Sequence, residues 1–269
     1  MMGAWRAMSA FMRASLATML QYRGELLLWA IWGVVYPAVA MAMWSAAVKG
    51  APGGQNIRGM DPRDFAAYFL LTMIVGHVVA AWDIFEMGSL VRTGAMSPRL
   101  LQPVLPIWQS LADNLSYKIT TLVLLVPIWI GVAWFAHPRL HTSMPELIVG
   151  LWAMLMAAAI HYVWGYNVAL MAFWVTRMDA IAELWWGMNL FFGGRIAPLA
   201  LLPLPLQWGA KLLPFQWILW FPSATLAGQL DFRSIAMGLI WQLGWFGGGL
   251  IVFHIVWRLA IRRYSAVGA

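Results

Sequence analysis

The sequence predicts an all-α membrane protein with six transmembrane helices, an N-terminal interfacial helix and a re-entrant helical hairpin between the fifth and sixth spans. Hydrophobic residues make up 62% of the 269 residues, and charged residues make up only 10%. A soluble domain of this size carries about 25% charged residues, so a water-soluble fold is excluded. The charged residues lie mainly between long apolar runs, as in chains that cross a membrane several times. Because no polar segment is long enough to fold separately, residues 1–269 are expected to form one membrane domain.

Residues 1–24 are predicted to form a helix that lies in the membrane interface. Arg6 and Arg13 point away from one apolar helical face. That face consists of Trp5, Met8, Met12, Leu16 and Met19. Such a division is typical of interfacial helices, although an ordinary packed helix is the alternative. The arginines also interrupt the apolar run that a secretory signal would need.

Six apolar segments follow, and each is compatible with the roughly 20 residues that a bilayer requires. They cover residues 26–48, 65–84, 115–136, 147–175, 180 onward and 235–257. An even number of spans places both termini on one side of the membrane. Of the 17 Lys and Arg residues, ten then fall on the side of the termini and seven on the other. This excess favours cytoplasmic termini.

The fifth segment runs into an apolar stretch, residues 193–228, that contains five prolines. Proline removes a backbone donor and clashes with the preceding turn, so no continuous helix can pass through. Non-helical backbone at membrane depth persists only where protein buries it or a water-filled cavity accepts its polar groups. We therefore expect the re-entrant hairpin here, with its turn around residues 207–211. Its candidate gate residues are Gly194, Arg195, Pro198, Pro214, Phe215 and Pro222. For Arg195, gating an outer exit and extending its charge to the interface are equally good interpretations.

Residues 86–106 are too polar to cross a membrane and too apolar for a flexible linker. Ser97 followed by Pro98 is typical of a helix start, and Pro103 would end that helix after a short run. Such a stiff helix would present Leu100 and Leu101 and suits docking into a groove of another protein. A structured turn on the lipid headgroups is the alternative. The candidate docking residues are Arg92, Gly94, Arg99, Leu100, Leu101 and Pro103.

Other sites carry weaker signals. Among the histidines within spans, His161 lies near aromatic residues, and His161 with Tyr166 forms the best candidate for a substrate cavity. The histidines are not at the i, i+4 spacing of a metal site, so no metal ligands are predicted. Asp83 and Glu183 fall near span ends, where contact with water or pairing with arginine is expected. No catalytic set is recognisable, and no basic patch interleaved with aromatics predicts nucleic-acid binding.

Three motifs, taken in order along the chain, resemble the type-2 ABC exporter permeases, within them a branch of small six-span subunits. The first is Tyr22-Arg23-Gly24-Glu25 before the first span. The second is Val91-Arg92-Thr93-Gly94 followed by Leu100-Leu101-Gln102-Pro103. The third is the broken segment with Phe192-Gly193-Gly194, Ile196-Ala197-Pro198-Leu199, Leu213-Pro214-Phe215 and Pro222. Met96-Ser97-Pro98 departs from the family, where many relatives carry an acidic residue.

The resemblance implies a permease in the inner membrane of a bacterium that exports a hydrophobic or amphiphilic substrate by alternating access. It implies two copies of an ABC ATP-binding subunit, a second permease subunit (identical or homologous), and membrane lipids as partners. Because the chain lacks the Gly-x-x-x-x-Gly-Lys-Ser/Thr phosphate loop, ATP and Mg²⁺ are expected in the partner, with no cofactor or catalytic residue here. The main alternative is a transporter driven by an ion gradient, with relays at His77 and His161. A membrane-embedded enzyme is a third reading without a catalytic cluster to support it.

Overall fold

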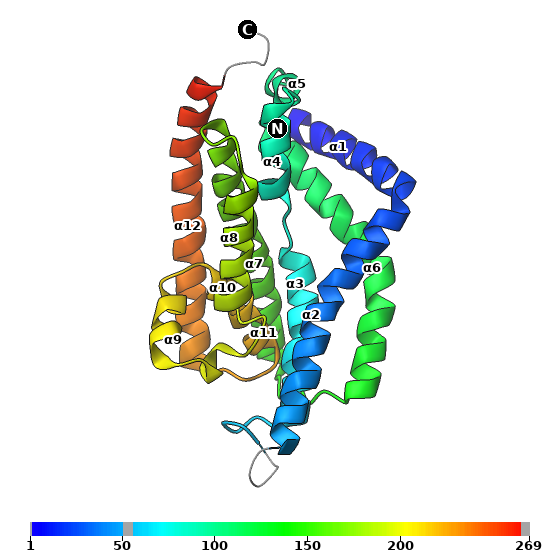
Figure 1. The fold of residues 1–269 in the computed structure, drawn as a ribbon, viewed down its shortest axis with the longest axis vertical. Coiled ribbons are helices and arrows are strands. Elements are labelled where there is room, and N and C mark those ends of the chain that lie inside the picture. Colours follow the sequence, from blue (N-terminus) through cyan, green and yellow to red (C-terminus); the bar gives the residue numbers. More distant parts are fainter. Residues whose placement is uncertain (1, 51–55, 265–269) are drawn as a thin grey trace.

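The computed structural model describes residues 2–50 and 56–264, and the chain in it is helical almost throughout (Figure 1). Helix accounts for 81% of the structure, and the described residues contain no strand, so the all-α prediction is confirmed. Residues 51–55 of the first predicted loop and the last five residues of the tail lie outside the described part.

Within the described residues, five helical segments are long and apolar enough to cross a membrane. They are α2 (Arg23–Gly50), α3 (Pro62–Val79) with α4 (Asp83–Arg92), α6 (Pro106–Ala136), α7 (Met144–Ala169) with the 3₁₀ turn η1 (Leu170–Phe173), and α12 (Phe232–Arg263). The predicted fifth span corresponds to α8 (Asp179–Phe192), which has 14 residues. At 1.5 Å per residue, α8 is about 21 Å long and shorter than a hydrocarbon core of about 30 Å. A sixth span therefore stays a prediction.

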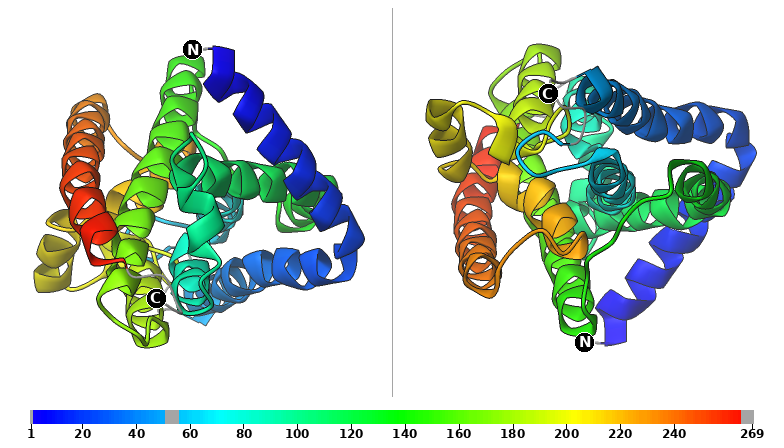
Figure 2. Two further views of the ribbon diagram at one scale, coloured as in Figure 1. Left: turned by 90° about the horizontal axis from the view of Figure 1, so that it is seen from above. Right: turned by 90° about the horizontal axis from the view of Figure 1, so that it is seen from below.

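The two described ends of the chain lie at the same end of the bundle, together with the short helix α5 (Met96–Leu100) (Figure 1). The N-terminal helix α1 (Met2–Gln21) crosses this end obliquely and lies beside α6 (Figures 1 and 2). Met8, Met12 and Met19 are half-buried, and Ser116 on α6 donates a hydrogen bond to the Met12 carbonyl at 3.4 Å. The predicted helix exists, and part of its apolar face packs on the protein.

The second predicted span is not one continuous helix. The sequence pattern extends it to Ile84, whereas α3 ends at Val79 and α4 begins at Asp83. Residues 80–82 between them are not helical. Side chains from two neighbouring helices stabilise this break, as described below.

The proline-rich stretch forms η2 (Leu199–Leu201), α9 (Leu204–Lys211), α10 (Phe215–Ile218) and α11 (Trp220–Leu226). The expected turn at residues 207–211 is wrong, because these residues belong to α9. Pro203 is the N-cap of α9 and Pro205 lies in its first turn, so these prolines start a helix instead of breaking one. The non-helical turn comes later, at residues 212–214. Re-entry of this stretch into the membrane stays a prediction.

The end of the bundle opposite the termini is held together by the loop between α6 and α7. Arg139 in that loop forms an ion pair of 2.6 Å with Asp61, the residue that caps α3. Burial raises the pKa of Asp61, but backbone hydrogen bonds from Asp64 and Arg63 and the charge of Arg139 outweigh it and lower the pKa overall. The backbone N–H of His141 donates to the Ala227 carbonyl at 3.3 Å. The loop therefore fixes α3 against α11.

Candidate functional site

The predicted docking segment leaves α4 through Gly94, whose φ of +74° lies in the left-handed region that favours glycine. The helix that follows, α5, begins at Met96, and its N-cap position is Ala95 without a side-chain hydrogen bond. The predicted helix start at Ser97 and Pro98 is therefore wrong, because the helix begins before them and Ser97 does not cap it. Ser97 is occupied elsewhere, since its hydroxyl lies 2.6 Å from the Tyr264 hydroxyl at the end of α12.

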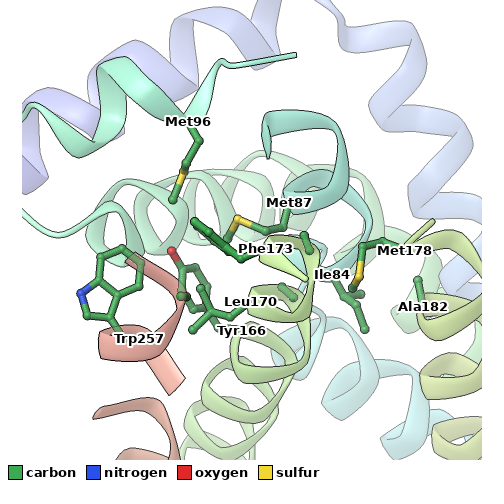
Figure 3. Close-up of a cluster of buried hydrophobic side chains, with 12 residues drawn as sticks. Ile84, Met87, Met96, Tyr166, Leu170, Phe173, Met178, Ala182 and Trp257 are labelled. Carbon is green, nitrogen blue, oxygen red and sulfur yellow. The ribbon is translucent and has the colours of Figure 1, made fainter. Parts of the chain in front are cut away.

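Two further contacts attach this segment to the bundle. The Arg92 guanidinium donates to the Thr176 carbonyl between η1 and α8 at 3.2 Å. Met96 is fully buried, and Figure 3 places its side chain above Phe173 and Tyr166 in a cluster of buried apolar residues. That cluster joins α4, α5, α7, η1, α8 and α12. The segment is thus fixed to three parts of the bundle.

The two predicted docking leucines have different environments. Leu101 is 87% exposed, directly after the last residue of α5. Leu100 is half-buried and packs against the buried cluster. Pro103 is exposed beyond the helix end. Leu101 is therefore the residue of the pair that a partner can reach.

Arg99 and Tyr166, which the sequence assigned to different sites, line the same small cavity of about 10 Å³ beneath α5. Asp83 and Glu86 also line it. Tyr166 is completely buried, as a member of the apolar cluster. It does not line the large cavity to which His161 belongs.

That large cavity has a volume of about 770 Å³ and extends between α2, α3, α4, α6 and α8. His161 reaches it from α7, and Arg195 reaches it from the segment after α8. The helix break at residues 80–82 forms part of its wall, together with Asp83 and Asn114.

The break leaves backbone carbonyls without the hydrogen bonds that a continuous helix would give them. Side chains from α6 and α7 bind these carbonyls instead. His161 Nδ1 lies 2.7 Å from the Val79 carbonyl, and Lys118 Nζ donates to the Ala80 carbonyl at 2.7 Å. Asn189 on α8 donates to His161 Nε2 at 3.2 Å. A carbonyl at Nδ1 and a donor at Nε2 together select one neutral imidazole tautomer. His161 therefore acts as a structural link between three helices at the cavity wall.

Asn114, Lys118 and Asn189 were not predicted as site residues from the sequence. Single polar residues on apolar helices carry no spacing signal of their own. Their common feature, a position beside the break, is visible only once the helices are packed.

The predicted gate residues have three different environments. Gly194 and Arg195 follow α8, and the Tyr68 hydroxyl on α3 donates to the Gly194 carbonyl at 2.7 Å. Phe215 is 2% exposed and packs edge-on against Trp185 with ring centroids 4.9 Å apart, and Trp185 lines the large cavity. Pro198, Pro214 and Pro222 are buried within the segment. Within the described ranges, no three His, Asp or Glu side chains come together to hold a metal.

The fold and the cavity define a multi-pass helical membrane protein without a nucleotide-binding motif. The model of the ABC-2 family transporter proteins matches residues 54–268, so the chain belongs to this family and is a type-2 ABC permease. Such a permease is the membrane component of an ABC transporter, is not itself catalytic, and implies partnership with an ABC ATP-binding subunit. Comparisons with curated proteins and with solved structures give no match.

Proposed function

We propose that this chain exports a hydrophobic or amphiphilic substrate from a bacterial cell by alternating access, driven by ATP hydrolysis in two copies of a separate subunit. The observation that carries the proposal is the construction of the docking segment. It exposes Leu101 to a partner while Ser97, Arg92 and Met96 tie it to α12, to the start of α8 and to the buried cluster. A displacement of α5 would therefore be transmitted to α4 and α8, which border the large cavity.

The proposal includes a six-span arrangement with both termini in the cytoplasm of a bacterium, in its inner membrane. It is supported by the position of both described ends beside α5 and by the excess of Lys and Arg on that side (Figure 1). In this arrangement α8 makes the fifth crossing, and residues 193–228 dip into the outer leaflet and return to the outer side as a re-entrant gate.

A second permease subunit, identical or homologous, belongs to the same proposal. The apolar side chains of Leu28, Trp32 and Val39 on α2 are exposed in the single chain, and α2 borders the cavity. Membrane lipids would cover the remaining apolar surface. Family membership favours this function over transport driven by an ion gradient. ATP and Mg²⁺ would bind to the ATPase subunits.

Replacing Leu101 with Asp tests the docking role. Burying a leucine contributes about 1.5–3 kcal/mol, so binding of the ATPase should weaken about ten- to a hundredfold. Because Leu101 is 87% exposed, the variant should still insert and fold. The measurement is co-purification of the ATP-binding subunit with the tagged chain from native membranes, followed by titration of the purified subunit.

Leu212→Asp provides a matched control, since Leu212 is 71% exposed and lies just after α9, remote from α5. It should retain the ATPase at the wild-type level. Unchanged ATPase binding in Leu101→Asp would show that α5 does not dock on the ATPase through Leu101. Equal loss in both variants would indicate a general effect of the added charge.

A further inference from the structure

The acidic residues of this chain are concentrated around the large cavity. The chain has ten Asp and Glu residues and 17 Lys and Arg residues. Five acidic residues line the cavity, namely Glu25, Asp83, Glu86, Asp113 and Glu183. Arg195 is the only Lys or Arg among the lining residues that the structure describes. A strongly basic protein thus has a cavity lined by an excess of carboxylates.

These carboxylates share one end of the cavity. Glu25 lies in the first turn of α2, Asp83 and Glu86 lie in α4, Asp113 lies near the start of α6, and Glu183 lies in the second turn of α8. All of these turns lie toward the end of the molecule that carries the termini (Figure 1). The described residues place no Lys, Arg or His within ion-pairing distance of these carboxylates, since both ion pairs found involve Asp61 and Asp64. These carboxylates therefore have no direct ion-pair partner there, while Asp83 accepts a hydrogen bond from Asn114 and Arg99 lines the adjoining small cavity with Asp83 and Glu86.

Aromatic rings make up much of the remaining wall. The lining includes Trp29, Trp32, Trp82, Tyr117, Trp185 and Trp186. Trp29 on α2 and Trp82 in the helix break pack with their rings tilted by 55° and ring centroids 5.4 Å apart. The faces of tryptophan rings attract cations, and their area also suits apolar groups.

Three polar atoms in residues of the cavity wall have no hydrogen-bond partner among the described residues. Asn114 is 7% exposed and donates to Asp83, but its Oδ1 has no hydrogen-bond partner among the described residues. The indole nitrogens of Trp82 and Trp129, which also line the cavity, are unpartnered there as well. Buried polar atoms are normally hydrogen-bonded, so unpartnered ones in a cavity wall indicate a place for a ligand or water.

From this combination we infer that the cavity is a binding site for a lipophilic organic cation. The cation lies among the carboxylates and tryptophans near the end with the termini, and its apolar groups extend along the aromatic wall toward α3 and α8. The volume of about 770 Å³ is within the range of pockets for drug-sized ligands, roughly 300–1,000 Å³. Arg195 lines the cavity beyond the far end of α8, and its positive charge opposes binding of the cationic group at that end. This inference rests on the proposed transport function, of which it specifies the substrate class.

The test compares two lipophilic ions of nearly the same shape and opposite charge, tetraphenylphosphonium and tetraphenylborate. The full-length chain is placed in nanodiscs of zwitterionic lipid, and equilibrium binding is measured against empty nanodiscs to subtract partitioning into lipid. We expect saturable binding of tetraphenylphosphonium that is at least tenfold tighter than that of tetraphenylborate. Equal binding of the two ions, or no saturable binding of the cation, would overturn the inference.

Three variants locate the site. Glu25→Gln and Glu183→Gln remove exposed carboxylates at the cavity, so folding should be unaffected, and each should weaken cation binding about fivefold. Asp179→Asn is the control, because Asp179 is exposed one turn before Glu183 on α8 but does not line the cavity. It should bind like the wild type. If both glutamine variants match the control, the cation binds elsewhere and the inference fails.

These measurements separate the site from the transport function. They use the chain without its ATPase, so a failure here leaves the docking experiment on Leu101 untouched. Conversely, the chain could bind the cation selectively and yet retain no ATP-binding subunit. That result would support the cation site and contradict the proposed function as an ABC exporter.

Discussion

Gly194 holds the turn that follows α8, at the far end of the large cavity. Its φ is +79°, and a Cβ added there would lie 2.7 Å from the Tyr68 hydroxyl and 3.1 Å from the Trp220 Cβ. Gly194→Ala should therefore combine backbone strain of about 1–2 kcal/mol with a steric clash. We expect a lower Tm of the purified chain, measured by the change in tryptophan fluorescence on heating.

Gly187→Ala is the matched control for this prediction. Gly187 lies within α8, and an added Cβ meets nothing within 4 Å. Alanine in a helix interior is favoured over glycine by about 0.5–1 kcal/mol, so the Tm should be unchanged or higher. If Gly194→Ala behaves like Gly187→Ala, the left-handed turn at Gly194 does not contribute to stability.

The sequence predicted that His161 and Tyr166 line one cavity, but only His161 lines the large cavity. The two residues are five positions apart on α7, which corresponds to about 140° around the helix. They therefore face different surroundings, and Tyr166 lies in the buried cluster. Both residues are aromatic and polar, so composition alone could not separate them, whereas helical geometry could have done so.

Among the elements, α5 is short, and its position depends on contacts outside it. Ser97 and Tyr264 share a hydrogen bond of 2.6 Å, while the Tyr264 ring packs on Phe173 with centroids 5.6 Å apart. Tyr264→Phe removes the hydrogen bond and keeps the ring. A typical hydrogen bond contributes about 1 kcal/mol, so amide exchange in residues 94–101 should accelerate about fivefold.

Hydrogen–deuterium exchange measured by mass spectrometry tests this prediction. Ser97→Ala removes the other half of the same bond and should give the same acceleration, and the double variant should add nothing further. Additive effects would mean that the two hydroxyls act on α5 through different partners. Unchanged exchange in all three variants would show that α5 is not held by α12.

Proline positions predicted the ends and breaks of helices only in part. Pro37 and Pro127 lie inside α2 and α6, which continue past them. The break between α3 and α4 contains neither proline nor glycine; it is Ala80-Ala81-Trp82. It depends on His161 and Lys118, which bind carbonyls across long sequence separations. Local sequence therefore cannot predict it.

For the whole molecule, hydrophobic run length was sufficient to predict five long helices, because the bilayer fixes the length of a span. It was not sufficient for α8, where the apolar pattern continues past Phe192 but the helix ends before Gly193 and the left-handed Gly194. The concentration of carboxylates around one cavity was equally out of reach. It comes from α2, α4, α6 and α8 together, and their packing is not encoded in any one segment.

The central claim is that α5 docks on a separate ATP-binding subunit, and thiol cross-linking tests it most directly. The chain has no cysteine, so Leu101→Cys and Leu212→Cys each introduce a single thiol. After a short bifunctional thiol- and amine-reactive cross-linker is applied to the complex in native membranes, Leu101→Cys should yield a chain–ATPase product and Leu212→Cys should not. Cross-linking of the ATPase through Leu212→Cys, or through neither position, would contradict the account.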